Sequence, residues 1–167
     1  MTLGLDCSTV TCGLAFYDGT VITDAGFVDI SKCPTNKEKA LRVISVIDAH
    51  PHIHSTSKIN LEAALSGFMG GRTSQQVIIL LARFNAVFEY IVAEHFKIPV
   101  KLIGASTARK HVFGKSRVKG IDPKTYVKSQ LSLKMDLTKF DKINKIGNID
   151  KRCGDMYDAM VISMADT

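Results

Sequence analysis

The sequence lacks tryptophan, and aromatic side chains make up only 7% of its 167 residues. It also lacks an unbroken run of about 18 apolar residues, the usual minimum for a membrane-spanning helix, so we expect no contact with a membrane. The first residues show neither the basic start nor the long apolar stretch of a secretory signal peptide. These absences favour a cytoplasmic location.

Cysteine is scarce, and the four residues present form no C-x-x-C pair. Structural zinc sites usually take their ligands from such pairs, so no zinc site is expected. In a reducing cytosol the side chains of Cys7, Cys12, Cys33 and Cys153 should remain free thiols. Cys7 and Cys12 lie in apolar sequence, which indicates that they pack in the core.

The remaining composition suits one folded domain over residues 1–167, since 46% hydrophobic and 23% charged residues are ordinary values for a globular protein. The net charge of +6 is unevenly distributed. Residues 101–152 carry 14 Lys or Arg against 4 Asp or Glu, and the rest of the chain is slightly acidic. This concentration is typical of a nucleic-acid-binding surface, although a solvated Lys-rich face has the same pattern.

Strands dominate the first part of the chain. Residues 2–6, 11–17 and 20–30 each predict a strand, and Asp18-Gly19 is a strong hairpin signal between the last two. We therefore expect an antiparallel meander. Two further strands are expected over 58–64 and 99–104.

Helices and loops separate the later strands. His50, His52 and His54 follow the first helix, where we assign them to a flexible exit loop, with metal binding as the alternative. The element order predicts an α/β fold in which helices cover a mixed sheet. The expected elements are a helix over 36–49, a loop over 66–74, a helix over 74–97, a loop over 105–120, a helix that opens at Asp122-Pro123, a loop over 136–152 and a last helix from about 154.

The helix over 74–97 is apolar on nearly every side. A helix that covers one face of a sheet normally keeps a polar stripe toward water. We therefore expect this helix to bury a second side against the same helix of another subunit, which gives a two-fold homodimer.

Carboxylates stand where a purely structural fold would not place them. Asp6 ends the first apolar strand and Glu62 interrupts the fourth, although acids are depleted in strands and costly to bury. Asp155 and Asp158 are three residues apart near the start of the last helix, so they share one helix face. If the two strands are adjacent and the helix packs against their ends, the four carboxylates converge.

Four converging carboxylates repel one another unless cations lie between them. Mg²⁺ suits such oxygen ligands best, and two ions about 3.5–4 Å apart form a common clamp for phosphodiester hydrolysis. Singly, Asp6 could belong to a turn, and Asp155 and Asp158 could stabilise the helix dipole. The joint pattern is what predicts a metal-dependent nuclease.

That joint pattern occurs in the ribonuclease H-like nucleases, and the sequence resembles their RuvC-like Holliday junction resolvases, particularly the bacteriophage forms. The resemblance covers nearly the whole chain. The matching segments are Leu3-Gly4-Leu5-Asp6-Cys7-Ser8 with Gly13-Leu14-Ala15, Asn60-Leu61-Glu62-Ala63, and Gly154-Asp155-Met156-Tyr157-Asp158-Ala159-Met160.

The resemblance implies a ribonuclease H-like fold with a five-stranded mixed sheet, three antiparallel strands followed by two parallel ones, flanked by helices. It implies that Asp6, Glu62, Asp155 and Asp158 are catalytic and bind two Mg²⁺, for which Mn²⁺ can substitute. The implied reaction nicks Holliday junctions, replication forks and other branched DNA and leaves a 5′ phosphate. It would serve recombination, repair or phage DNA processing, in the bacterial cytoplasm if a phage encodes the chain.

Basic residues are the candidates for gripping DNA. The segment 120–128 is similar to the family segment whose lysine approaches the scissile phosphate, which makes Lys124 a catalytic candidate and Lys128 the alternative. Phe68, in a glycine-rich loop, is a candidate to stack on an unpaired base, and core packing is its alternative. The family often has an aromatic residue where this chain has Leu65. The remaining candidates for phosphate contacts are Arg72, Arg109, Lys110, Lys115, Arg117 and Lys119.

Three other functions fit part of the pattern. A ribonuclease H acting on RNA–DNA hybrids would place its acids similarly, and a junction-binding protein without cleavage would share the basic surface. Residues 5–9 with Gly13 also resemble the phosphate-binding hairpin of sugar kinases and actin-like ATPases. Those proteins pair two such domains, for which 167 residues are too few.

Overall fold

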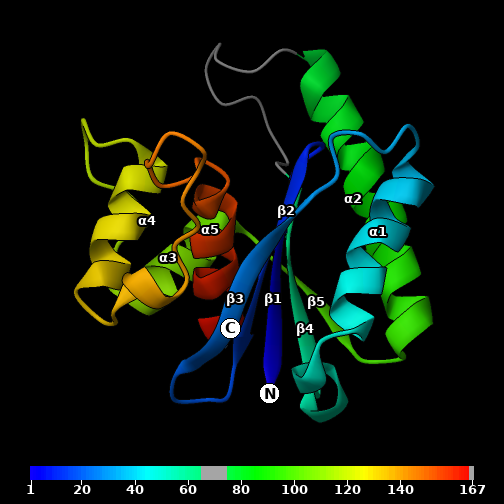
Figure 1. Cartoon of the computed structure of the whole chain (residues 1–167), viewed down its shortest axis with the longest axis horizontal. Coiled ribbons are helices and arrows are strands. Elements are labelled where there is room, and N and C mark those ends of the chain that lie inside the picture. The colour runs from blue at the N-terminus through cyan, green and yellow to red at the C-terminus, as the bar shows by residue number, and fades with distance from the viewer. Residues whose placement is uncertain (65–74, 166–167) are drawn as a thin grey trace.

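The computed structural model describes residues 1–64 and 75–165, in which five strands form one sheet in the order β3-β2-β1-β4-β5 (Figure 1). Neighbours β1–β2 and β2–β3 are antiparallel, whereas β1–β4 and β4–β5 are parallel. The predicted mixed sheet is therefore confirmed. The strands are β1 Thr2–Cys7, β2 Thr11–Tyr17, β3 Ile22–Asp29, β4 Lys58–Glu62 and β5 Val100–Ile103.

Local capping signals fix the ends of two helices. The Thr35 side-chain oxygen accepts a hydrogen bond from the backbone N–H of Glu38, and the Glu38 carboxylate accepts one from the backbone N–H of Thr35. This reciprocal pair is a capping box, and it starts the first helix. Asp122 caps the fourth helix, and Pro123 occupies its first turn. The helices are α1 Asn36–Asp48, α2 Gln75–Phe96, α3 Ala105–Phe113, α4 Pro123–Ser132 and α5 Cys153–Met164, with short 3₁₀ turns η1 Pro51–Ser55 and η2 Leu137–Lys139.

The expectation of an irregular loop over 105–120 is wrong, because its first half is helix α3. Gly104 precedes this helix, and Gly114 ends it in the left-handed conformation at φ 77°. Only Ala108 of α3 is buried, so no apolar periodicity marks the helix in the sequence. The basic residues of this segment are therefore carried partly by a rigid element.

The histidines after α1 also belong to a regular turn rather than a flexible loop, because His52 and His54 lie in η1 and His50 caps its start. His50 places its Nε2 2.8 Å from Oδ2 of Asp24 and stacks on the ring of Phe16 at 4.2 Å between centroids. His52 packs 5.2 Å from His50. These contacts give the first two histidines a structural role.

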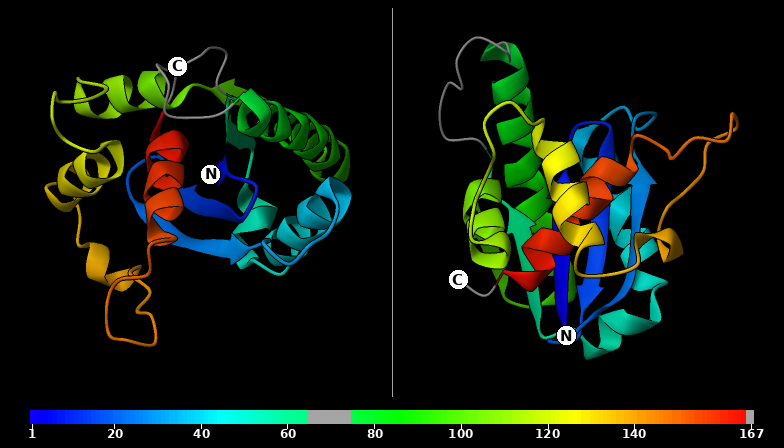
Figure 2. Two further views of the ribbon diagram at one scale, coloured as in Figure 1. Left: turned by 90° about the horizontal axis from the view of Figure 1, so that it is seen from above. Right: turned by 90° about the vertical axis from the view of Figure 1, so that its left-hand side faces the viewer.

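The sheet separates two hydrophobic layers. Helices α1 and α2 cover one face, and α5, flanked by α3 and α4, covers the other (Figure 2). The first layer includes Phe16, Phe84 and Phe88, and the second includes Met156 and Met160, all fully buried. The chain thus has the three-layer arrangement expected of helices on a mixed sheet.

Two glycines let α5 lie directly on the sheet. A Cβ added to Gly4 would lie 2.2 Å from the carbonyl oxygen of Ala159, and one added to Gly13 would lie 2.2 Å from that of Asp155. A residue with any side chain would hold the helix farther away, because such distances are well below van der Waals contact. Gly4 and Gly13 therefore set the position of the helix that carries Asp155 and Asp158.

Helix α2 is the most exposed apolar element of the described residues. Its buried residues are Phe84, Asn85, Phe88 and Val92. With a mean hydropathy of 1.6 over its best window, α2 would be long and apolar enough to cross a membrane by length and composition alone, a test that the core helix of a soluble protein also passes. A search for unbroken apolar runs misses this helix, because a few polar residues interrupt an otherwise apolar segment.

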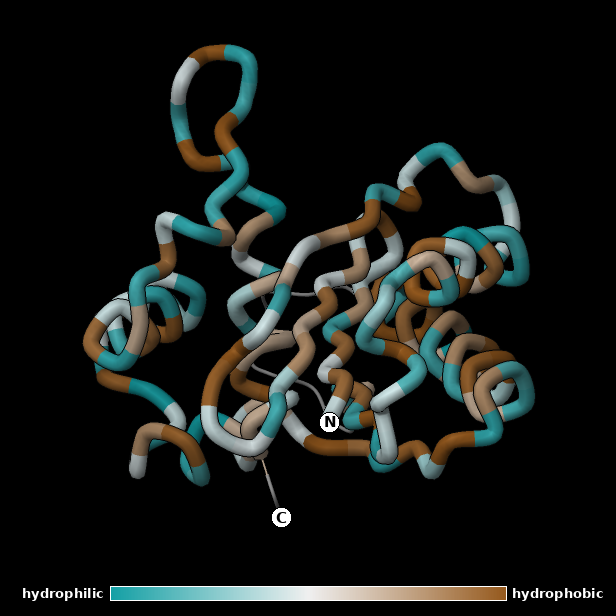
Figure 3. Tube along the Cα trace, turned by 60° about the horizontal axis from the view of Figure 1, so that its bottom comes forward, coloured by the Kyte–Doolittle hydropathy of each residue, from teal (hydrophilic) through white to brown (hydrophobic). Residues whose placement is uncertain are grey.

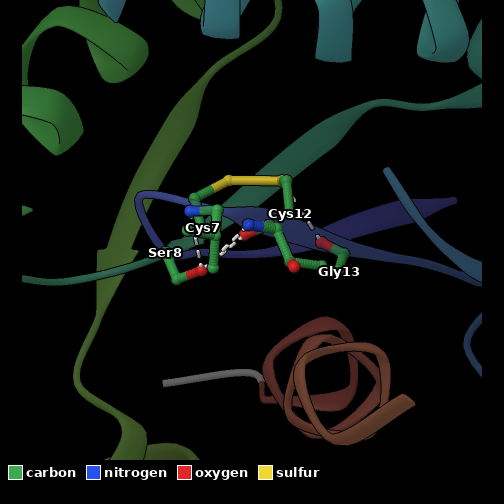
Figure 4. The surroundings of a disulfide bond; sticks show 6 residues. Cys7, Ser8, Cys12 and Gly13 are labelled. Carbon is green, nitrogen blue, oxygen red and sulfur yellow. Dashed lines mark hydrogen bonds between the residues drawn. A yellow bond between two sulfur atoms is a disulfide. The ribbon is translucent and has the colours of Figure 1, made fainter. Parts of the chain in front are cut away.

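Cys7 and Cys12 face each other across β1 and β2 and form a disulfide (Figure 4). Their Cα atoms are 4.2 Å apart. The expectation of free thiols is therefore wrong for this pair, since strand register brings the two side chains together whatever the sequence spacing. Both residues are buried as expected, and Cys33 and Cys153 are free.

Candidate active site

Two acidic residues meet at the carboxyl ends of the two central parallel strands. In the register between β1 and β4, Leu5 lies opposite Leu61, so Asp6 and Glu62 are the next residues of each strand. A side-chain interaction with Glu62 is among the causes that raise the pKa of Asp6, so the two carboxyl groups lie close to each other. The sheet thus brings together the first two acids that the sequence singles out.

The other two acids approach from α5. Asp155 lies in the first turn of this helix, and Asp158 lies one turn later. Both act electrostatically on Asp6, and Glu62 acts on Asp158 as well. The structure therefore gathers all four carboxylates at one place.

Burial and neighbouring charge make two of the acids, Asp6 and Asp158, costly to ionise. Burial raises the pKa of Asp6 well above its usual value, and the hydrogen bond and charge of Glu62 act in the same direction. Burial also raises the pKa of Asp158, against the opposing effect of Arg109. Such perturbation in a group of acids is typical of a functional site.

Two basic residues in the described part of the chain contact the carboxylates. Nη2 of Arg109, on α3, lies 2.8 Å from Oδ1 of Asp158, and both side chains are largely buried. Lys124, on α4, forms a salt bridge with Asp155. This contact raises the pKa of Lys124 even though burial acts in the opposite direction.

The donor set fits a divalent cation that prefers oxygen. All four acids supply carboxylate oxygens, the ligands that such a cation prefers. Burial is the main cause of the raised pKa values of Asp6 and Asp158, and the neighbouring acids add to it. Within residues 1–64 and 75–165, no three such side chains already surround a common point as metal ligands would. Arg109 and Lys124 hold two of the carboxylates instead.

The structure places the remaining DNA-binding candidates differently. Arg109 is drawn into the acid cluster, contrary to its expected place in an exposed loop, and its buried Nε has no hydrogen-bond partner among the described residues. Lys128 lies beside the site with its Nζ 5.7 Å from the ring centroid of Tyr157. Phe68, Arg72 and Leu65 lie outside the described residues. The exposed candidates are Lys110, Lys115, Arg117 and Lys119.

A shallow pocket of about 190 Å³ lies beside Lys124, the residue that contacts Asp155. Lys124, Lys128 and Lys151 line it together with Gly154 at the start of α5. Sequence reasoning missed Lys151, which belongs to a segment that we expected to be an unstructured loop. The excess of lysine in residues 101–152 is the only signal in the sequence that includes it.

Neither a protein-family model nor a curated protein matches the sequence. The structure, however, is similar to that of Thermus thermophilus RuvC, with a TM-score of 0.60, 15% identity, and coverage of 98% of this chain and 90% of that one. The T. thermophilus RuvC complex with a Holliday junction substrate gives a TM-score of 0.60 at 12% identity, covering 98% and 89% of the two chains.

The yeast mitochondrial Holliday junction resolvase Ydc2 gives a TM-score of 0.59 at 14% identity, covering 98% of this chain and 75% of that one. At such identities the likeness shows the fold. The chain therefore has the ribonuclease H-like fold of the RuvC-like resolvases, as the resemblance in its sequence implies.

Proposed function

We propose that this protein is a divalent-metal-dependent endonuclease that cuts Holliday junctions and other branched DNA. The convergence of Asp6, Glu62, Asp155 and Asp158 is the observation that carries this proposal. The fold supports it, because solved structures with the same fold include a RuvC bound to a Holliday junction and a mitochondrial junction resolvase. Recombination, repair and phage DNA processing are the processes that such an activity would serve.

The four carboxylates would hold two Mg²⁺ ions, or Mn²⁺ in their place. When bound, the metal supplies Lewis-acid activation for hydrolysis of the phosphodiester. The expected products are a 5′ phosphate and a 3′ hydroxyl. The role of the fold is to fix the acids, because Gly4 and Gly13 set α5 at a defined distance from β1 and β2.

Lys124 is the residue best placed to contact the scissile phosphate. Its side chain is about half exposed, at 52%, and already meets an anionic oxygen, that of Asp155. A phosphate oxygen at the same place would accept a hydrogen bond from the ammonium group of Lys124, whose positive charge would stabilise the negative charge of the phosphate. Lys128, which lines the same pocket, is the alternative.

Arg109 has a different role, that of a positioning residue. Its side chain is only 14% exposed and is held by Asp158. Because a buried ion pair is costly to break on one side, Arg109 should keep the Asp158 carboxylate oriented toward Asp6 and Glu62. Lys110, Lys115, Arg117 and Lys119 would bind phosphates farther from the cut, as would Arg72.

A homodimer through α2 would place two active sites on one junction. Ile79, Leu80 and Tyr90 are 44%, 55% and 68% exposed on this helix, and an apolar surface of this kind is typical of subunit contacts. A two-fold dimer matches the approximate two-fold symmetry of a four-way junction. Each subunit would then nick one strand.

The test is cleavage of labelled four-way junctions, forks, flaps, linear duplex and RNA–DNA hybrids, with Mg²⁺ and with chelator. We expect Mg²⁺-dependent nicks on branched DNA and little cutting of linear duplex. Preferential cutting of the hybrid would instead identify a ribonuclease H, and tight junction binding without nicks would identify a binding protein. Either result would overturn the proposal.

A further inference from the structure

Residues 141–151 form an ordered arm that stands out from the body of the protein between η2 and α5 (Figures 2 and 3). Ile143 and Ile149 pair across it, and the backbone N–H of Asp150 donates to the carbonyl of Lys142 at 2.7 Å. Near the tip, Oδ1 of Asn144 accepts from the backbone N–H groups of Ile146 and Asn148. Polar interactions therefore hold the arm in one shape.

The base of the arm is fixed to the rest of the fold. Arg152 donates to Asp150 and, from Nη1, to Oδ2 of Asp29 on β3 at 2.8 Å. The same guanidinium lies 4.8 Å from the ring centroid of Phe27. Since Arg152 directly precedes α5, these contacts join the base of the arm to the helix that carries Asp155 and Asp158.

The outer surface of the arm is apolar and basic. Ile143 and Ile146 are 61% and 80% exposed. In Figure 3 hydrophobic positions alternate with hydrophilic ones along the projecting segment. Lys142, Lys145 and Lys151 are exposed and form no salt bridge with a residue that the structure describes.

The acids of the arm, by contrast, face inward. Asp141 accepts a hydrogen bond from the hydroxyl of Tyr157, and Asp150 is paired with Arg152. The charge that the arm presents outward is therefore positive.

An exposed isoleucine on a rigid, positively charged arm has no stabilising role in the isolated chain. The exposed side chain of Ile146 does not contribute the free energy that its burial would give, and ordering the arm costs conformational entropy. Proteins that bind the minor groove use this combination, in which an isoleucine or similar side chain enters a base step while basic residues contact the phosphates on either side.

The arm also has the right position. The pocket beside the candidate active site is lined by Lys124 and by Ile149 and Lys151 of the arm. Lys124 contacts Asp155. DNA held at the acids would therefore reach the root of the arm without a gap.

We propose that this arm grips the duplex next to the cut, with Ile146 inserted between base pairs from the minor groove and Lys145 on the adjoining phosphates. The inference rests on the proposed function and adds to it the surface that recognises the duplex flanking the branch.

The test uses the full chain with Ile146→Asn, which keeps the number of side-chain heavy atoms and removes the apolar character. Leu133→Asn is the matched control, because Leu133 is 81% exposed at the end of α4 and lies outside the arm. Affinity for a four-way junction is measured in chelator. The junction carries 2-aminopurine, whose fluorescence rises on unstacking, at successive positions of the duplex beside the cut.

We expect the unchanged protein to raise the fluorescence at one base step. Ile146→Asn should lose that rise and bind about tenfold more weakly, as the loss of one buried apolar side chain implies. Leu133→Asn should behave like the unchanged protein. Lys145→Gln should lower the slope of log affinity against log salt by about one.

An Ile146→Asn variant that unstacks the junction and binds it like the unchanged protein would overturn the arm proposal, as would equal losses in Leu133→Asn. Cleavage by the unchanged protein in Mg²⁺ is scored separately. If branched DNA is nicked while Ile146 proves irrelevant, only the arm proposal fails. If the unchanged protein cuts no branched DNA, the proposed function fails.

Discussion

Replacing Gly13 by alanine should displace α5 and disable the proposed active site. The new Cβ would lie 2.2 Å from the carbonyl oxygen of Asp155 and 2.7 Å from the backbone nitrogen of Met156. Because ordinary contact begins at 3.4 Å, the start of α5 must retreat by about 1 Å. Neither obstacle is a side chain that can rotate away, since both belong to the helix backbone.

The consequences for stability and activity can be estimated separately. Forcing an extra methyl group into a packed core costs about 1–3 kcal/mol, and a displacement of about 1 Å in a catalytic group can lower the rate about 100-fold. Urea unfolding followed by circular dichroism measures the first effect. Single-turnover nicking of a four-way junction in saturating Mg²⁺ measures the second.

Gly26→Ala is the matched control, because Gly26 lies on the neighbouring strand β3 and an added Cβ meets nothing within 4 Å. It should unfold and cleave like the unchanged protein. If Gly13→Ala matches this control in both stability and nicking rate, then the close approach of α5 to β2 does not position Asp155, and the account of the site is wrong.

Three further outcomes follow from the site and from α2. Asp6→Asn should abolish nicking while junction binding in gel shifts persists, and cutting at the normal rate in Mg²⁺ would refute the assignment of Asp6. Since burial raises the pKa values of Asp6 and Asp158, the metal-free folded protein retains protons that the unfolded chain loses above pH 3.8. The contribution of these two acids to the free energy of unfolding should therefore fall as the pH rises above this value, and Mg²⁺ should reduce that fall in thermal melts. If the protein forms the proposed dimer, Leu80→Glu should convert it to a monomer in sedimentation and leave the melting temperature nearly unchanged, and a variant that stays dimeric would exclude this face of α2.

The sheet and the acid cluster could be read from the sequence because both depend on strong local signals. Apolar strand sequence with Asp18-Gly19 at a hairpin predicts the meander, and an acid inside a buried strand conflicts with the cost of burying charge. Asp6 and Glu62 stand out for that reason alone. Asp155 and Asp158 needed the further assumption that the last helix packs on these strands, which the small residues Gly4 and Gly13 make possible.

Other features depend on contacts between distant segments and left no such signal. Helix α3 buries only Ala108, so its sequence looks like a basic loop. The pairing of Arg109 with Asp158 joins residues 49 positions apart, and the Cys7–Cys12 disulfide follows from strand register rather than spacing. The arm was missed because polar side chains order it, whereas sequence patterns detect mainly the burial of apolar ones.

The charges at the site indicate how the two basic residues divide their work. Four carboxylates faced by Arg109 and Lys124 leave an excess of negative charge, which agrees with the raised pKa of Asp6. Divalent cations that neutralised this negative charge would weaken the salt bridges, and a basic side chain with room to move could then leave its carboxylate. Lys124 is half exposed and Arg109 is enclosed, so Lys124 is the one that can exchange Asp155 for a phosphate. Arg109 would stay on Asp158, where its charge opposes the rise of that acid's pKa and so favours the ionised form that a cation would bind.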